Sequence, residues 1–343
     1  MLNIINTGKF FLQHQLNKHY PVKVTKYANA KIKSEITVYR PVAENSGIKT
    51  SKKVILAFHG MTMLGAADPK YISVCKSLSG CGYTVIAPQI DSMQNLQIVP
   101  SEIATIVDLI NAITQNNELC PEGRVSIFAA SFSAGMSLFA CADETIKNKI
   151  SSICLIGTFA DIETSITYLI SNQQSDNYGR LIVLKNFLKY SIDVSGAVYK
   201  AFDTAISDNF FKKKKPELPD YLKTLSLKDY DITSRLLNNP YFRLYHWNRI
   251  KKNDNFQQIM DQFPPGNYLK NINASVLLIH GIHDNVIPPE ESITLFTNLK
   301  CKKVKSKLIL TPLMSHSEIK LNINVLPALI DLLSGLSFFF RAV

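Results

Sequence analysis

The stretch "IFAASFSAGMSLF", Ile127 to Phe139, decides how the rest of the chain is interpreted. Its first part is an apolar run typical of a strand buried on both faces, and its last part has the apolar spacing of a helix. Between them lies "SFSAG", Ser131 to Gly135, which contains two hydroxyl side chains. A strand followed at once by a helix is the repeating unit of a parallel α/β sheet.

The same alternation of strand and helix continues on both sides of this stretch. Apolar runs predict six buried strands, "KVILAFHG" (53–60), "YTVIAPQI" (83–90), "RVSIFAAS" (124–131), "ISSICLIGT" (150–158), "SVLLIHG" (275–281) and "SKLILTP" (306–312). Helical spacing predicts helices at 71–78, 102–114, 134–142, 290–300 and 325–336. An alternating stretch from Val22 predicts an edge hairpin around Asn29. We therefore expect an α/β fold with a mostly parallel, doubly wound sheet and helices on both faces.

A long segment, residues 163–270, interrupts this rhythm. It contains amphipathic helical pieces, several prolines and a run of four lysines, Lys212 to Lys215. Because a structureless loop of roughly a hundred residues is improbable inside a compact domain, we expect a mostly helical cap. It is inserted after the sixth core strand, 150–158, when the two strands of the edge hairpin are counted. The core is then divided into two parts, residues 1–162 and 271–343, with the cap between them.

Composition and charge narrow the classes of protein. The 343 residues are 46% hydrophobic, and the formal net charge of +11 is spread along the chain. A spread surplus favours a solubility role over a nucleic-acid arm, so no nucleic-acid partner is expected. The lysine run is most simply a solvated loop, with contact to an anionic membrane surface or substrate as the alternative. The sequence leaves the oligomeric state open.

Signals for targeting, membrane insertion and metal binding are weak. The six cysteines lack paired spacing and suit buried free thiols in a reducing compartment, and the N-terminal residues lack a continuous apolar core, so we expect a cytoplasmic protein. The stretch "VLPALIDLLSGLSFFF" (325–340) is too short and interrupted to span a membrane; it predicts a helix packed on the sheet, with an interfacial helix as the alternative. Without HExxH, GxGxxG or a P-loop, no metal or cofactor is expected.

Polar side chains follow several of the predicted strands. His59 follows the first long run, Ser131 and Ser133 the third, Asp284 the fifth and His316 the sixth. Ligands of open parallel sheets bind at the carboxyl ends of the strands. We therefore expect a hydroxyl, a carboxylate and an imidazole to meet at one edge of the sheet.

These motifs resemble those of the α/β-hydrolases. "SFSAG" resembles the GxSxG nucleophile elbow, with Ser131 in place of the first glycine, and "LLIHGIHDNVIPPEES" resembles the strand and HGxxD loop that carry the family's acid. The resemblance implies Ser133 as the nucleophile, Asp284 as the acid and His316 as the base, in the family's chain order. "HGM" resembles the oxyanion turn, which implies the backbone N–H groups of Met61 and Ala134 as donors.

Each of these assignments has an alternative in the sequence. Ser131 is the alternative nucleophile, disfavoured because Ser133 would then stand where the family has glycine. Asp161, which follows the sixth strand, is the alternative acid. His59 is expected to shape its turn and His283 to be structural or face solvent. An aromatic cluster in the insertion predicts packing of the cap, or alternatively an apolar wall over the site; its members are Tyr241, Phe242, Tyr245 and Trp247.

The resemblance implies a serine hydrolase that works through an acyl-enzyme. We expect first a carboxylesterase or lipase-like enzyme whose partner is a small-molecule or lipid-like acyl ester. A peptidase, a thioesterase and an acyltransferase share the same triad and are alternatives, as is a binding protein that has lost turnover.

Overall fold

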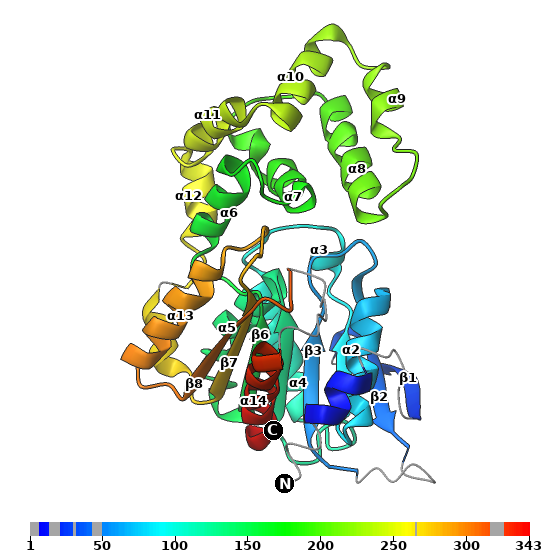
Figure 1. Cartoon of the computed structure of the whole chain (residues 1–343), viewed down its shortest axis with the longest axis vertical. Helices are drawn as coiled ribbons and strands as arrows, with labels where there is room; N and C mark the ends of the chain where they lie inside the picture. Colours follow the sequence, from blue (N-terminus) through cyan, green and yellow to red (C-terminus); the bar gives the residue numbers. More distant parts are fainter. Residues whose placement is uncertain (1–6, 14–20, 30–31, 43–49, 265, 316–325) are drawn as a thin grey trace.

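The computed structural model describes residues 7–13, 21–29, 32–42, 50–264, 266–315 and 326–343 (Figure 1). Within these residues one eight-stranded sheet has the strand order β1-β2-β4-β3-β5-β6-β7-β8. The strand β5 (Val125–Ala130) lies in the middle of the sheet, paired in parallel with its neighbours on both sides. The chain segment that opens the sequence analysis therefore sits at the centre of the molecule.

The sheet has a parallel part and an antiparallel edge. The parallel strands are β3 (Val54–Phe58), β4 (Thr84–Pro88), β5, β6 (Ile150–Ile156), β7 (Ser275–Gly281) and β8 (Ser306–Thr311). The hairpin of β1 (Val22–Asn29) and β2 (Ile32–Pro41) adds to the outer side of β4 in antiparallel register. The predicted parallel sheet and edge hairpin are both confirmed.

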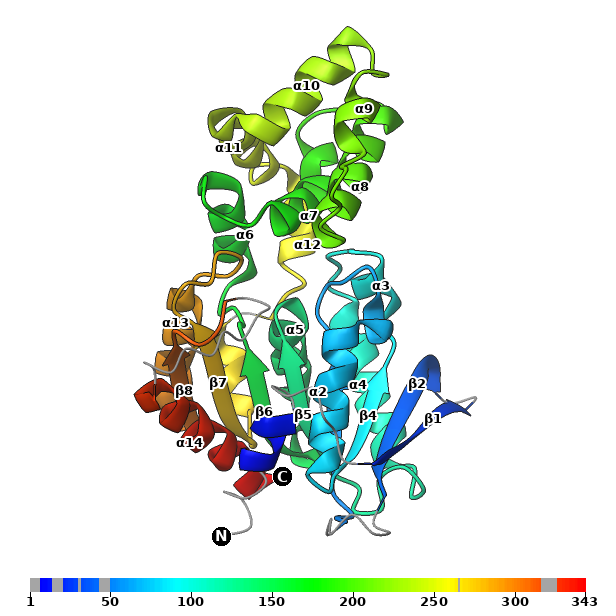
Figure 2. The same ribbon diagram turned by 45° about the vertical axis from the view of Figure 1, so that its right-hand side comes forward.

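Helices cover both faces of the sheet (Figures 1 and 2). Because successive side chains of a strand point to opposite faces, Ile127 and Ala129 of β5 belong to one buried cluster and Phe128 belongs to the other. The first cluster includes side chains of α4 (Glu102–Thr114), α5 (Phe132–Cys141) and α13 (Pro289–Cys301), and the second those of α2 (Pro69–Gly80) and α14 (Leu326–Ala342). This is the doubly wound arrangement that the sequence predicts.

The last helix packs on the sheet. Phe339 is fully buried, and the ring of Phe340 stacks on that of Tyr83 with 5.6 Å between centroids. The packed helix predicted from the apolar C-terminal stretch is therefore confirmed. In the described parts of the chain, none of the helices combines the length and apolarity needed to cross a membrane.

The insertion after β6 is helical, as predicted. It contains α6 (Ile162–Ser171), α7 (Asn177–Phe187), α8 (Gly196–Phe210), α9 (Leu218–Leu222), α10 (Leu227–Asn238), α11 (Pro240–Ile250) and α12 (Asp254–Met260). These helices, which we call the cap, stand beyond the carboxyl ends of the parallel strands (Figures 1 and 2).

Two buried arginines tie the cap helices together. Arg180 of α7 is 5% exposed and donates to the carbonyl of Leu169 in α6, while Arg243 of α11 is 2% exposed and donates to the carbonyl of Leu236 in α10. Both guanidinium groups therefore sit at the negative ends of helices, where the last carbonyls need donors. Burial, with the charge of Arg180 second, lowers the pKa of Arg243 to about 10.

The aromatic residues of α11 divide into buried and exposed members. Trp247 is 1% exposed, and its Nε1 donates to the hydroxyl of Thr167 at 2.9 Å. Tyr241 and Tyr245 are 81% and 55% exposed. Trp247 therefore packs within the cap as expected, and the two tyrosines face solvent rather than forming an apolar wall over a site.

The lysine run and the cysteines largely match their predictions. Lys212, Lys214 and Lys215 are exposed, while Lys213 forms ion pairs with Asp208 and Glu217 at 3.3 and 2.8 Å. All six cysteines lie in described residues and are free thiols, five of them buried and Cys301 exposed.

Glu102 is a buried carboxyl group at the start of α4. It is 3% exposed and accepts a hydrogen bond from the hydroxyl of Ser92. Burial, with the charge of Asp91 second, raises its pKa from 4.5 to about 7. The folded chain therefore binds this proton more tightly than the unfolded chain, and the associated stability, present below pH 4.5, is lost as the pH rises through 7.

We predict that Glu102→Gln stabilises the fold at pH 8 by on the order of 2 kcal/mol and changes it little at pH 4.5. Thermal unfolding at both pH values measures the difference, with the exposed Glu118→Gln as control. A shift in Tm that is the same at both pH values would contradict the assignment of the raised pKa.

Candidate active site

A single residue, Ser131, connects β5 to α5. The strand ends at Ala130 and the helix begins at Phe132. Ser131 has φ 60° and ψ −135°, a conformation that costs a residue other than glycine about 1–3 kcal/mol. Its N–H donates to the carbonyl of Ile156 at 2.7 Å and its own carbonyl accepts from Ala134 N at 3.0 Å, so it ends the ladder and starts the helix. This sharp, strained turn is the geometry of a nucleophile elbow.

The structure does not give Ser133 the nucleophile geometry that the sequence pattern predicts. Ser133 lies in the first turn of α5, is fully buried, and its Oγ donates to the carbonyls of Ala130 at 2.9 Å and Phe58 at 3.4 Å. A fully buried hydroxyl that donates to two backbone carbonyls is not accessible to a substrate. The correction arises because the helix begins at Phe132, two residues before the predicted start at Ala134.

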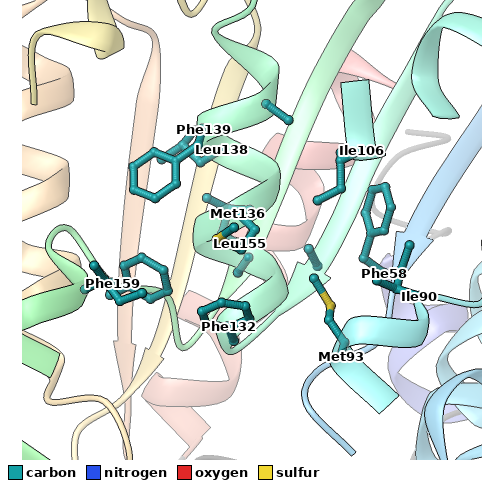
Figure 3. Close-up of a cluster of buried hydrophobic side chains, with 14 of the residues drawn as sticks. Phe58, Ile90, Met93, Ile106, Phe132, Met136, Leu138, Phe139, Leu155 and Phe159 are labelled. Carbon is teal, nitrogen blue, oxygen red and sulfur yellow. The ribbon is translucent and has the colours of Figure 1, made fainter. Parts of the chain in front are cut away.

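The small residues around the turn fit Ser131. Ala129 and Ser133, two before and two after it, are both fully buried where β3, β5 and α5 close together. Gly135 has a separate reason to be small, since a Cβ atom there would lie 2.3 Å from Cζ of Phe159. Figure 3 shows the Phe159 ring beside α5. The pattern of the elbow is therefore Ala129-x-Ser131-x-Ser133.

The turn after β3 lies next to Ser131. A Cβ atom built on Gly60 would be 3.6 Å from the Cβ of Ser131, so the His59–Gly60–Met61 turn lies close beside the elbow. The predicted donor Ala134 is already committed, because its N–H bonds to Ser131 O. The N–H that follows Ser131 belongs to Phe132, at the start of α5, where N–H groups have no partner within the helix. Phe132 therefore replaces Ala134 beside Met61 as the candidate oxyanion donor.

His59 shapes this turn. It is buried, its Nε2 accepts from the N–H of Ile90 at 3.1 Å, and its Nδ1 lies 2.8 Å from the carbonyl of Gly60. An N–H group only donates, so the proton of the ring is on Nδ1 and the ring is neutral. Burial lowers its pKa, which keeps it neutral. This is the structural role that the sequence predicts for His59.

Asp284 is held rigidly in the loop after β7. It is 4% exposed, and its Oδ1 accepts from the N–H groups of Val286 and Ile287 at 2.9 and 3.0 Å. Its Oδ2 lies 3.3 Å from Nε2 of His280, a fully buried ring whose Nδ1 is 2.6 Å from the hydroxyl of Ser292. Hydrogen bonds of this kind orient a carboxylate and stabilise its charged form.

The predicted base, His316, lies outside the described residues. The segment that leads to it is described as far as Ser315 and crosses the end of β7. A Cβ atom on Gly281 would lie 2.3 Å from the carbonyl oxygen of Met314, so only glycine fits beneath this crossing. The chain therefore passes the acid loop two residues before His316.

The strands that precede Ser131 and Asp284 are close neighbours in the sheet. Ser131 follows β5 and Asp284 follows β7, with β6 between them. Two strand spacings amount to about 10 Å. An imidazole ring with one hydrogen bond on each side spans a gap of this order.

Comparisons with known proteins bear on the fold of the chain. A family model described as "Prolyl oligopeptidase family" matches residues 226–326, which include the acid loop but not Ser131. A dipeptidyl-peptidase 4 from Giardia intestinalis is 35% identical over 60 residues, which are 18% of this chain and 8% of that protein.

Two solved structures share the fold over nearly the whole chain. Pyrococcus horikoshii acylaminoacyl peptidase has a TM-score of 0.53 at 14% identity, covering 95% of this chain and 42% of that one. Porphyromonas gingivalis dipeptidyl peptidase 4 has a TM-score of 0.53 at 11% identity, covering 97% and 37%. The chain has the α/β-hydrolase fold of these structures. The chain spans less than half the length of these two relatives.

Asp161, the alternative acid, lies at the start of a helix. Asp161 is exposed, and its Oδ1 accepts from the N–H of Thr164 as the N-cap of α6. The carboxylate of Glu291 accepts from the Ala160 and Asp161 N–H groups at 2.9 Å and fixes the same turn. Asp161 therefore caps a helix. His283, which precedes Asp284 in the chain, is exposed to solvent.

Sequence motifs missed several supporting groups of the site. His280 belongs to the quoted HGxxD motif, but its contact with Asp284 depends on the fold of the loop. Phe132 was not considered as an oxyanion donor because the sequence predicts that the helix starts at Ala134, whereas α5 starts at Phe132. Among the described residues, no cluster of three histidine, cysteine, aspartate or glutamate side chains is arranged to hold a metal ion.

Proposed function

We propose that this chain is a serine hydrolase that cleaves peptide or aminoacyl bonds, with Ser131 as nucleophile, His316 as base and Asp284 as the acid that orients it. The observation that carries the proposal is the strained φ of Ser131 at the strand-to-helix turn beside Gly60. Strain of this kind persists where the surrounding structure imposes it, and it is concentrated at catalytic sites.

The proposed mechanism follows from these roles. Oγ of Ser131 attacks the substrate carbonyl while His316 removes its proton, and the N–H groups of Met61 and Phe132 stabilise the oxyanion by about 3 kcal/mol each. His316 then protonates the leaving amine, and water hydrolyses the acyl-enzyme by the same steps. Asp284 holds the imidazole in its reactive tautomer and stabilises its cation.

The choice of substrate class rests on the comparisons. The matching family model and the relatives named above are peptidases, which favours amide over ester substrates. The carboxylic esters expected first from the sequence become the second candidate, because the same triad cleaves both.

We predict that Ser131→Ala loses activity by a factor on the order of 10⁴ or more, because it removes the attacking atom. Ser133→Ala is expected to keep activity within about tenfold, since it removes only a buried hydrogen bond. Labelling by a fluorophosphonate and turnover of a p-nitrophenyl ester measure both variants.

Circular dichroism and thermal unfolding serve as the folding controls for these serine variants. Loss of labelling in Ser133→Ala with retention in Ser131→Ala would reverse the assignment. A folded wild-type chain that takes up no label would favour the non-catalytic binding alternative.

For the acid, we predict that Asp284→Asn lowers kcat by on the order of 10³ to 10⁴, because the imidazole loses its orienting charge. Asp161→Asn retains an N-capping side chain and is expected to change kcat by less than about threefold. Steady-state kinetics on both variants decide the matter. A larger loss in Asp161→Asn would identify Asp161 as the acid.

For the substrate, we predict that aminoacyl and dipeptidyl anilides are cleaved efficiently. The ratio of their kcat/KM to that of the matched esters is expected to exceed the ratio of the uncatalysed hydrolysis rates. Matched anilide and ester pairs with the same acyl group, assayed with wild type and Ser131→Ala, give this comparison. Efficient turnover of esters without detectable anilide cleavage would instead support the carboxylesterase alternative.

A further inference from the structure

A tyrosine of the cap contacts the candidate oxyanion turn. Tyr178, in the first turn of α7, donates its hydroxyl hydrogen to the carbonyl of Met61 at 3.3 Å. The side chain is half-buried, and its ring packs on that of Phe210 in α8 with 5.6 Å between centroids. The hydroxyl thus reaches from the cap to the residue whose N–H is the candidate donor.

The position of α7 is fixed by contacts with the acid loop. The N–H of Asp176, just before the helix, donates to the carbonyl of Asn285 at 2.9 Å. Gly179 lies close to the same loop, since a Cβ atom built on it would be 3.4 Å from Cγ1 of Val286. The turn of helix that carries Tyr178 is therefore anchored one residue away from Asp284.

The other end of α7 is anchored to the core as well. The side chain of Asn186 donates to the carbonyl of Leu96 at 2.8 Å and accepts from the N–H of Ile98 at 3.0 Å. With both ends of α7 held by loops of the core, the contact between Tyr178 and Met61 is set by the fold and is not left to a freely moving side chain.

The oxyanion turn has other supports, but they lie further along it. Gln94 donates to the carbonyl of Met63 at 3.4 Å, and the hydroxyl of Thr62 donates to Asp68 at 3.1 Å. The bond from Tyr178 acts on Met61 itself. The N–H and the carbonyl of Met61 belong to two successive planar peptide groups, which are joined only by the φ and ψ torsions of Met61. A hydrogen bond that holds the carbonyl therefore limits the rotations that would turn the N–H away.

We propose that Tyr178 is a positioning residue that holds the Met61 N–H toward the developing oxyanion, and so couples the cap to the catalytic turn. This inference rests on the proposed function. Burial raises the pKa of Tyr178 well above its ordinary value, although the adjacent Met63 backbone acts in the opposite direction. The hydroxyl therefore stays protonated and able to donate.

The test compares Tyr178→Phe with Tyr221→Phe. Tyr221 is also half-buried in the cap, and its hydroxyl donates to the carbonyl of Ala197 at 3.2 Å, far along the chain from the site residues. Each variant loses one hydrogen bond between a tyrosine and a carbonyl. We expect Tyr178→Phe to lower kcat about tenfold with KM changed by less than twofold, and Tyr221→Phe to change neither.

Hydrogen exchange gives a readout that is independent of turnover. The amides of residues 61–64 are expected to exchange several-fold faster in Tyr178→Phe and at the wild-type rate in Tyr221→Phe. An unchanged kcat and exchange rate in Tyr178→Phe, or a change confined to KM, would overturn the proposal. If the wild type is not labelled by a fluorophosphonate, the proposed function fails, while hydrogen exchange still tests whether Tyr178 holds the turn.

Discussion

The structure depends on one backbone constraint, the passage from β5 to α5 through a single residue. Only a left-handed φ at Ser131 lets its N–H complete the ladder to β6 while its carbonyl begins the helix. With that geometry Ser131 is partly exposed at the carboxyl end of β5, and Ser133 is fully buried in the first turn of α5. The small neighbours and the contact with Gly60 follow from the same closure. The strain is offset by the packing of the central strand, which is buried along nearly its whole length.

Much of this fold could be predicted from the sequence because its signals are local and strong. Continuous apolar runs identify the parallel strands, and the spacing of 102–114 gives the bounds of α4 without error. The loop after β7 has equally local signals, since HGxxD overlaps the end of a buried strand and Asp284 accepts hydrogen bonds from the backbone of its own loop.

Two kinds of feature could not be predicted from the sequence. One is the exact residue at which a helix begins, and the other is a contact between segments that are distant along the chain. Ser131 and Ser133 are both small and polar, and only the start of α5 distinguishes them, because pattern alone locates helix ends poorly. The N-cap role of Asp161 and the reach of Tyr178 to Met61 depend on how α6 and α7 fold back over the core. No spacing along the chain encodes such contacts.

The paired guanidinium groups of Arg180 and Arg243 limit how the cap can vary. Each is a permanent charge enclosed by helix carbonyls, so shortening α6 or α10 would strand a cation in an apolar interior. A lysine has three donors, too few for the contacts that Arg180 makes, and it lacks the planar fork with which both arginines reach their carbonyls. Diversity among close homologues of this chain is therefore expected at the solvent-facing rim around α9, while the helices that surround the two arginines keep their lengths.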